Sequence, residues 1–328
     1  MKRDFSRIPT SGQIFARQLW DYAGIFPPAQ LPLETAFQNF MCYFREDWRI
    51  FLSTFVVPMN RLSELEDLKR KTHPEARQIP LSLLLSLPES EVPAVDFENR
   101  LENQLAPLEW EKSAFFPAKV EAKVPAAKWL EKGTPLKDYL RVLWRQLGRV
   151  NPTVQVFLEF ENMHRHPIEK LRPVVEELTA MNTGELPKFS LKIRCGGPDA
   201  SFVPPVAFVR RFFRLLADSG LGFKATAGLH HPLNNDDKIM KTTAYGFLNF
   251  FVAAMLTKLK LAEDDEIREV LQSRDSGEFK FRENGLSWRE IIIDNQQIEH
   301  LRKHFAISIG SCSIAEPLED LEKLNWFK

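Results

Sequence analysis

Short apolar segments alternate with segments of helical periodicity along most of this chain, and the alternation limits the folds it can adopt. Eight strands are expected, at Arg17–Phe26, Arg49–Val57, Ile79–Ser86, Ala118–Val124, Val154–Phe160, Phe189–Arg194, Gly222–Ala227 and Phe305–Ser311. Eight β/α units in 328 residues are typical of a (β/α)8 barrel of the TIM type. We therefore predict an α/β fold of that kind, with a doubly wound parallel sheet as the alternative.

The segment 262–305 interrupts the alternation before the last strand. Asn284-Gly285 lies between two alternating runs, which is a strong hairpin signal. A helix is expected before this segment, over Met240–Leu259, and two helices are expected within it, over Asp264–Ser273 and Asn295–Lys303. The first of them is apolar on all sides, as a buried helix is. We predict a single barrel domain over residues 1–328, with 262–305 as an inserted subregion that acts as a lid or an oligomer contact.

The composition excludes several classes of partner. Lys+Arg and Asp+Glu are both 44, so no basic surface for nucleic acid is expected. Three cysteines are too few for a disulfide framework. The most apolar run, Phe247–Leu256, is shorter than the roughly 20 residues of a membrane helix. We predict a cytoplasmic protein with a small-molecule substrate, no nucleic-acid or membrane partner, and homo-oligomerisation as an open possibility.

Charged side chains occur in strands that a barrel would bury. In such barrels catalytic groups lie at the carboxyl ends of the strands, and alternate residues of a strand share one face. The side chains that share the interior face on this basis are Lys119, Glu121, Lys123, Glu159, Lys192, Arg194, Lys224 and Thr226. We predict Lys192, Lys224, Glu121 and Glu159 as catalytic. The alternative is that these charges form ion pairs that only fill the barrel.

Glycines follow the cation-bearing strands, where they allow backbone N–H groups to approach an anion closely. The predicted substrate or anion site consists of Arg194, Gly196, Gly197, Thr226, Gly228, His230, Gly310 and Ser311. The alternative is that each glycine only turns the chain.

Two lysines on neighbouring strands suggest covalent catalysis. A lysine must be neutral to attack a carbonyl carbon, and a second cation nearby lowers its pKa. We expect one of Lys192 and Lys224 to be a nucleophile whose pKa is lowered by the other. The predicted function is lyase chemistry on a small anionic carbonyl compound through a lysine imine, with no cofactor. The alternatives are a transferase or isomerase with the same anion site but no covalent lysine, and a non-catalytic ligand-binding barrel.

Two motifs resemble those of deoxyribose-phosphate aldolases. Gly222-Phe-Lys-Ala-Thr-Ala-Gly228 is similar to the seventh-strand motif of that family, and Gly310-Ser-Cys-Ser313 to its phosphate loop. The resemblance implies a class I aldolase in which Lys192 forms the Schiff base with a depressed pKa, Lys224 is the neighbour that lowers this pKa, and the glycines hold phosphate. Arg194-Cys195 departs from the small hydroxyl residues that follow the family's lysine.

The chain as a whole also resembles a family of uncharacterised bacterial barrel-like proteins. The motifs that carry this similarity include Asp21-Tyr-Ala-Gly-Ile-Phe-Pro-Pro28, Gly246-Phe-Leu-Asn249 and Gly310-Ser-Cys-Ser-Ile-Ala-Glu-Pro317. This second resemblance implies no activity.

The remaining candidates are a histidine pair, a cysteine and an aspartate. His230 and His231 with Asp236 and Asp237 have the residue types of a metal site, but we expect an acid/base or phosphate-contacting His230 and predict no metal. Cys195 beside Arg194 has the setting of a reactive thiol. No histidine partner can be assigned to it, so we interpret it as a small buried apolar residue. Asp21 is either catalytic or a turn residue.

Overall fold

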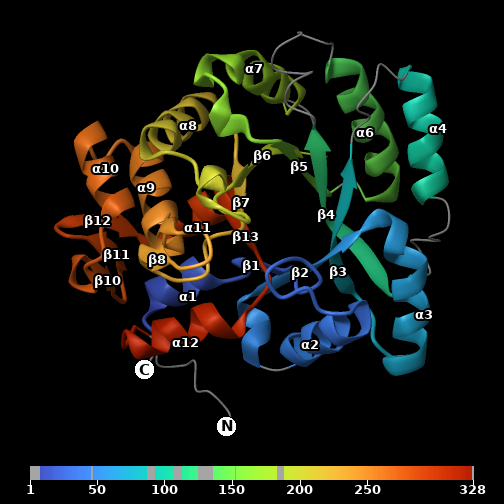
Figure 1. The fold of residues 1–328 in the computed structure, drawn as a ribbon, viewed down its shortest axis with the longest axis horizontal. Coiled ribbons are helices and arrows are strands. Elements are labelled where there is room, and N and C mark those ends of the chain that lie inside the picture. The colour runs from blue at the N-terminus through green and yellow to red at the C-terminus, as the bar shows by residue number, and fades with distance from the viewer. Residues whose placement is uncertain are drawn as a thin grey trace. The chain divides into compact units, whose positions relative to one another are not determined.

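The computed structural model describes residues 8–45, 47–86, 93–105, 113–124, 136–151, 153–182 and 188–326. Eight parallel strands close into a barrel in the order β1-β13-β7-β6-β5-β4-β3-β2 (Figure 1). Their bounds are β1 Trp20–Tyr22, β2 Leu52–Pro58, β3 Ile79–Ser86, β4 Phe115–Val124, β5 Gln155–Phe160, β6 Lys188–Arg194, β7 Phe223–Thr226 and β13 Ala306–Ser311. The predicted (β/α)8 barrel is confirmed.

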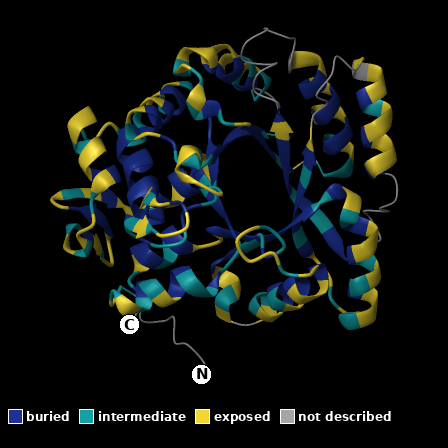
Figure 2. Cartoon of the chain, in the orientation of Figure 1, coloured by how far each residue is buried: buried dark blue, intermediate teal, exposed yellow. Residues whose placement is uncertain are grey.

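Helices alternate with these strands. Their bounds are α1 Thr10–Ala16, α2 Leu33–Arg45, α3 Leu62–Thr72, α4 Ala94–Leu105, α6 Leu136–Val150, α7 Arg172–Met181, α8 Val206–Ser219, α9 Phe247–Leu259, α10 Asp264–Gln272, α11 Asn295–His304 and α12 Ala315–Lys323. The barrel strands are mostly buried, as Figure 2 shows in dark blue. Every residue of α9 from Phe247 to Thr257 is buried too, as its all-round apolar pattern indicates. None of the helices in the described part of the chain is long and apolar enough to cross a membrane.

Several sequence-based boundaries are wrong: the second strand, for example, begins at Leu52 rather than Arg49, because Asp47–Ile50 forms a 3-10 helix. Two further cases are explained by the backbone. The predicted helix Met240–Leu259 begins only at Phe247, and Thr242–Ala244 forms strand β9, which pairs with β8 at Asn235–Asp237. The reason is the extended backbone of Gly246, with ψ 143°, whose N–H donates to the Asn234 side chain. The first strand is also shorter than Arg17–Phe26, because a positive φ of 48° at Gln18 breaks the extended chain before it.

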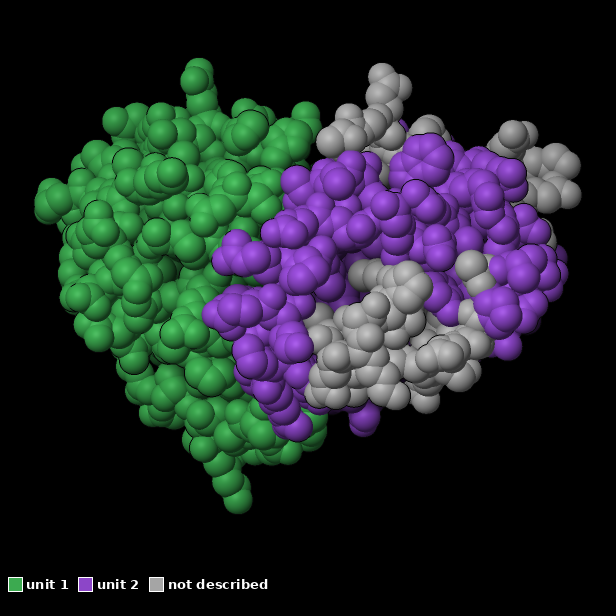
Figure 3. Space-filling view, turned by 90° about the horizontal axis from the view of Figure 1, so that it is seen from above, with its two compact units in different colours: residues 1–22, 39–53, 193–328 green, residues 23–38, 54–192 purple. Residues whose placement is uncertain are grey.

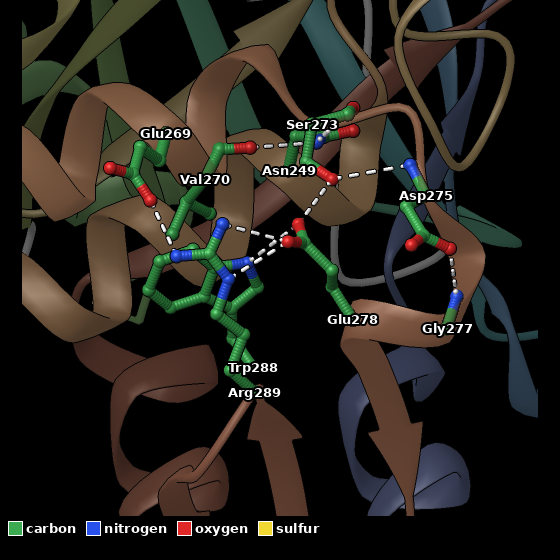
Figure 4. A network of polar contacts seen from close by, with 9 residues as sticks. All are labelled: Asn249, Glu269, Val270, Ser273, Asp275, Gly277, Glu278, Trp288 and Arg289. Atoms are coloured by element: carbon green, nitrogen blue, oxygen red, sulfur yellow. Dashed lines mark hydrogen bonds and ion pairs between the residues drawn. The ribbon is translucent and has the colours of Figure 1, made fainter.

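The insertion 262–305 contains the three-stranded antiparallel sheet β10 Phe279–Phe281, β11 Gly285–Trp288 and β12 Ile291–Asp294. The hairpin at Asn284-Gly285 is therefore confirmed, while β12 was not predicted. Figure 4 shows how the sheet is fixed to α10: Glu278 accepts hydrogen bonds from Ser273 Oγ at 2.6 Å and Arg289 Nε at 2.8 Å. Arg289 also bonds Glu269 of α10. The role of the insertion as a lid or oligomer contact stays a prediction.

Contacts within the chain define two compact units, coloured green and purple in Figure 3. Unit 1 consists of Met1–Tyr22, Asn39–Ser53 and Ile193–Lys328, and unit 2 of Ala23–Gln38 and Thr54–Lys192. Each unit contains a buried cluster of charged residues on its barrel strands. The two clusters are described separately below, and the single-domain organisation stays a prediction.

Candidate active site

A buried ammonium group lies between two buried carboxylates in unit 2. Lys192 Nζ is 2.6 Å from Glu121 Oε2 and 2.7 Å from Glu159 Oε2. The three side chains are only 4–8% exposed. Three of the four predicted catalytic residues thus form one cluster, which we call the Lys192 cluster. It can donate and accept protons within a volume that largely excludes water.

The strands explain why these side chains meet. Glu121, Glu159 and Lys192 lie in the second half of β4, β5 and β6, which are neighbours in the barrel. This is the carboxyl end of the strands, where catalytic groups of such barrels are found. Lys119, two residues before Glu121 on the same face, is also buried.

Ser82 of β3 is a member of the cluster that sequence reasoning missed. Its hydroxyl donates to Glu121 Oε1 at 2.6 Å, while Lys192 contacts Oε2. Both oxygens of Glu121 therefore have a donor, which holds the side chain in one orientation and favours its ionised form. The only signal in the sequence was the position of Ser82 in a strand, and serine is too common there to be singled out.

Lys192 is held in its protonated form. Burial alone would lower its pKa, but the carboxylates of Glu121 and Glu159 outweigh burial and raise the pKa above the ordinary lysine value. The expectation of a depressed Lys192 pKa is therefore wrong for the unliganded protein. The physical reason is that two carboxylates contact Nζ directly and stabilise its proton.

Unit 1 contains a second cluster, built on Lys224. Lys224 Nζ lies 2.7 Å from Asp21 Oδ2, and Ser308 Oγ donates to the same oxygen at 2.7 Å. Lys224, Asp21 and Ser308 are completely buried. Asp21 is thus an ion-pair partner rather than a turn residue. Ser308 and Lys224 are in register on the neighbouring strands β13 and β7.

The glycines after β6 and β7 allow their backbones to approach each other. A Cβ atom on Gly196 would lie 2.7 Å from the Gly228 Cα, and one on Gly228 would lie 2.4 Å from the Cys195 carbonyl oxygen. On β13, a Cβ at Gly310 would lie 2.8 Å from Thr226 Oγ1. Close packing is therefore sufficient to require these glycines, and their role in anion binding stays a prediction.

Several predicted anion-binding groups have partners within the chain. The Gly197 N–H donates to the Met240 sulfur at 3.4 Å. Ser311 Oγ donates to the Ser313 carbonyl at 2.6 Å. Arg194 is half-buried at the end of β6. An anion at these positions would have to displace Met240 from the Gly197 amide.

The two histidines after β7 face carboxylates of α12. His231 Nδ1 lies 2.5 Å from Asp320 Oδ2. His230 Nδ1 lies 3.3 Å from Glu316 Oε2, without the geometry of a hydrogen bond. The proximity of His230 lowers the pKa of Glu316. For Asp320, burial would raise the pKa, but the His231 contact and Lys323 outweigh it and lower the pKa.

The aspartates considered with these histidines as a metal site have other partners. Asp236 binds Arg274 through both of its oxygens. Asp237 Oδ1 accepts the backbone N–H groups of Ile239 and Met240, each at 2.8 Å. Over the described ranges, no group of three or more His, Cys, Asp or Glu side chains is arranged to hold a metal ion.

Cys195 is completely buried between β6 and the glycines that follow it. Burial raises the pKa of its thiol, although Arg194 opposes that effect. A thiol in this state is a poor nucleophile. Its interpretation as a small buried apolar residue is confirmed.

Two glycine substitutions separate backbone conformation from close packing. Gly220 and Gly228 have φ values of 74° and 71°, but a Cβ at Gly220 has nothing within 4 Å. We expect Gly220→Ala to lower the free energy of unfolding by roughly 1–2 kcal/mol, the cost of a left-handed alanine. Gly228→Ala should lower it by about 3 kcal/mol or more, because backbone atoms must also move. Urea unfolding of both variants checks this; equal losses would contradict the close approach.

Comparisons with protein-family models, with curated proteins and with solved structures find nothing that matches this chain. The resemblance to deoxyribose-phosphate aldolases therefore depends on the motifs at Gly222–Gly228 and Gly310–Ser313 alone.

Proposed function

We propose that this protein is an enzyme that acts on a small anionic carbonyl compound, with its proton-transfer chemistry at Lys192, Glu121 and Glu159. The observation that carries the proposal is the buried ammonium group between two carboxylates at the carboxyl half of three adjacent barrel strands. Replacing a buried ion pair with apolar residues is often neutral or stabilising. Packing alone therefore gives little reason to keep three charges there.

The geometry best supports an isomerase-type reaction with Lys192 protonated. The ammonium group donates a hydrogen bond to the carbonyl oxygen, and a glutamate takes a proton from the adjacent carbon. Negative charge then develops on the oxygen, where a fixed cation in a dry site stabilises it most. In an α-hydroxy carbonyl compound, returning the proton to the former carbonyl carbon, while the hydroxyl oxygen loses a proton and the former carbonyl oxygen gains one, completes an isomerisation. The raised pKa of Lys192 keeps this donor charged at neutral pH.

A lysine imine is the second candidate, and one distance favours it. Glu121 Oε2 lies 2.6 Å from Nζ, so it can take the ammonium proton when a carbonyl group arrives. The neutral amine then adds to the carbonyl carbon and a water molecule leaves. Cleavage of the adjacent carbon–carbon bond would make the protein a lyase, as the aldolase resemblance implies.

As a separate part of the proposal, the turns of unit 1 that follow β6, β7 and β13 bind an anion. Arg194 and His230 supply cationic or hydrogen-bonding side chains there, and Gly197 and Gly228 supply closely packed backbone. Charge-assisted hydrogen bonds to an oxyanion are about twice as strong as neutral ones. A cytoplasmic location remains part of this proposal, and homo-oligomerisation remains an open possibility.

The proposal is tested by hydrogen exchange at carbon. The protein is incubated in D2O with a panel of small phosphorylated and carboxylated aldehydes and ketones, and deuterium entry beside the carbonyl is followed by NMR. We expect exchange with at least one compound, and its loss in Lys192→Gln and Glu159→Gln. Lys123→Gln is the control, because Lys123 is 52% exposed and pairs with Glu161.

Borohydride reduction of the same mixtures separates the two candidates. Exchange without an adduct supports the isomerase form, and an adduct that peptide mass spectrometry maps to Lys192 supports the imine. Neither exchange nor adduct with any compound of the panel would overturn the proposal in favour of a non-catalytic ligand-binding barrel.

A further inference from the structure

The two ends of the segment between Asn234 and Gly246 are fixed together. The Gly246 N–H donates to Asn234 Oδ1 at 2.8 Å, and the Asn234 N–H donates to Asn249 Oδ1 at 3.1 Å. Asn234 Nδ2 also donates to the Leu271 carbonyl at 2.6 Å. These buried amide groups form a rigid base, from which residues 235–245 extend as one loop.

The loop itself is held weakly. It contains only the pair of three-residue strands β8 and β9, and an isolated two-stranded hairpin is marginally stable. At its end the Tyr245 hydroxyl donates to the Pro204 carbonyl at 2.8 Å, a contact that belongs to the base. Within residues 235–244, Asp236 forms a bidentate pair with Arg274, which also donates to Thr243, and the side chains of Asp236 and Arg274 are 73% and 51% exposed. Exposed pairs of this kind contribute little to stability. The loop can therefore open without disturbing its base.

Met240 makes the buried contact at the tip of this loop. It is only 4% exposed, whereas its neighbour Ile239 is 72% exposed. The Met240 sulfur accepts the Gly197 N–H at 3.4 Å and would lie 3.3 Å from a Cβ on Gly196. A thioether is a weak acceptor, so this amide has a poor partner. An oxyanion would replace it with a charge-assisted bond.

We propose that residues 235–244 form a lid over Gly196 and Gly197, with Met240 as its plug, and that an oxyanion of the ligand displaces Met240 from the Gly197 amide. This inference rests on the anionic substrate of the proposed function and adds the gate that admits it. The lid turns at Asn234 and Gly246, whose mutual hydrogen bond stays intact. Opening frees the tip, which contains the exposed Lys238 and Lys241.

Limited trypsin digestion with inorganic phosphate as the probe tests the lid. Cleavage after Lys238 and Lys241 is followed by mass spectrometry, with sodium chloride used to match the ionic strength. We expect phosphate to raise both cleavage rates in a saturable way, because bound phosphate favours the open loop. A parallel series with acetate shows whether a carboxylate is sufficient or a phosphoryl group is needed, and a saturable response to either anion supports the lid.

Substitutions at the tip supply the matched controls. Without phosphate, Met240→Ala should be cleaved about tenfold faster than the parent. Loss of the buried Met240 contact destabilises the closed loop and so raises the population of the open loop. Ile239→Ala, which alters the exposed neighbour, should be cleaved at the parent rate. If Met240→Ala does not fold, Met240→Leu keeps the apolar contact without the sulfur acceptor and should lower the half-saturating phosphate concentration.

Equal cleavage in phosphate, acetate and chloride, or a Met240→Ala rate equal to the parent rate, would overturn the lid. Failure of the lid and failure of the proposed function give different results. Lys192→Gln should lose deuterium exchange while keeping its anion-dependent cleavage. A parent protein that exchanges deuterium but shows no anion-dependent cleavage refutes the lid alone.

Discussion

Lys192→Met is expected to abolish deuterium exchange and to lower the free energy of unfolding by about 3–5 kcal/mol at pH 7.5. Methionine removes the ammonium group that contacts both Glu121 and Glu159. Two buried carboxylates then lose the ammonium group that both of them contact, and the cost of burying that charge without it is the source of the loss. Urea unfolding followed by circular dichroism measures it.

The loss should shrink as the pH falls toward 5. Without Lys192, burial and mutual repulsion raise the pKa values of the two glutamates above their unfolded values. The folded variant then binds more protons than the unfolded chain, so its stability falls as pH rises and recovers as pH is lowered. The parent should not show this dependence. Because its Lys192 pKa is raised, the lysine contribution is complete below about pH 10 and is lost only as pH rises further.

Two further variants make the result specific. Adding Glu121→Gln and Glu159→Gln to Lys192→Met should recover much of the lost stability, because the repelling charges are gone. Lys123→Met, in the exposed pair with Glu161, should change stability by less than about 1 kcal/mol. A Lys192→Met variant as stable as the parent at pH 7.5 would show that the carboxylates do not depend on this lysine.

Most of the barrel could be predicted from the sequence, because parallel strands buried on both faces are apolar runs of limited length. Ile79–Ser86 is an example in which the predicted and observed strand bounds are the same. The error at residues 240–246 has a different origin. The apolar pattern there continues into α9, but hydrogen bonds of Asn234 and Asn249 set the conformation of Gly246. Such long-range polar contacts leave no periodic signal.

The charged residues of the candidate site could be predicted from the sequence, but which of them contact each other could not. The alternation of faces was enough to select Glu121, Glu159, Lys192 and Lys224. Which acid contacts which lysine depends on the strand register and on side-chain reach, which a single sequence does not contain. The wrong direction of the Lys192 pKa follows from this, because the expectation placed a lysine beside it where the structure places two carboxylates.

A double-mutant cycle on Asp21 and Lys224 is expected to show strong coupling. Lys224→Met leaves the Asp21 carboxylate buried without the ammonium group it contacts, and should lower the free energy of unfolding by about 3–5 kcal/mol. Asp21→Leu leaves the ammonium group of Lys224 buried without its counter-ion and should cost about the same. The double variant should lose much less than the sum, because neither charge is then left alone.

The same cycle decides between the structural and the catalytic role of Lys224. Both side chains are 0% exposed, and an apolar pair of similar volume can replace a buried ion pair within about 2 kcal/mol of parent stability. If the ion pair of Asp21 and Lys224 only fills the barrel, the double variant should exchange deuterium at the same rate as the parent protein. We expect it to fold and to lose exchange, since the sequence predicts Lys224 as a catalytic residue. Lys323→Met controls for loss of a lysine and should change neither quantity measurably, because the Lys323 side chain is 71% exposed. If the double variant loses as much stability as the two single variants together, Asp21 and Lys224 are not coupled. Full deuterium exchange in a folded double variant would remove Lys224 from the catalytic site.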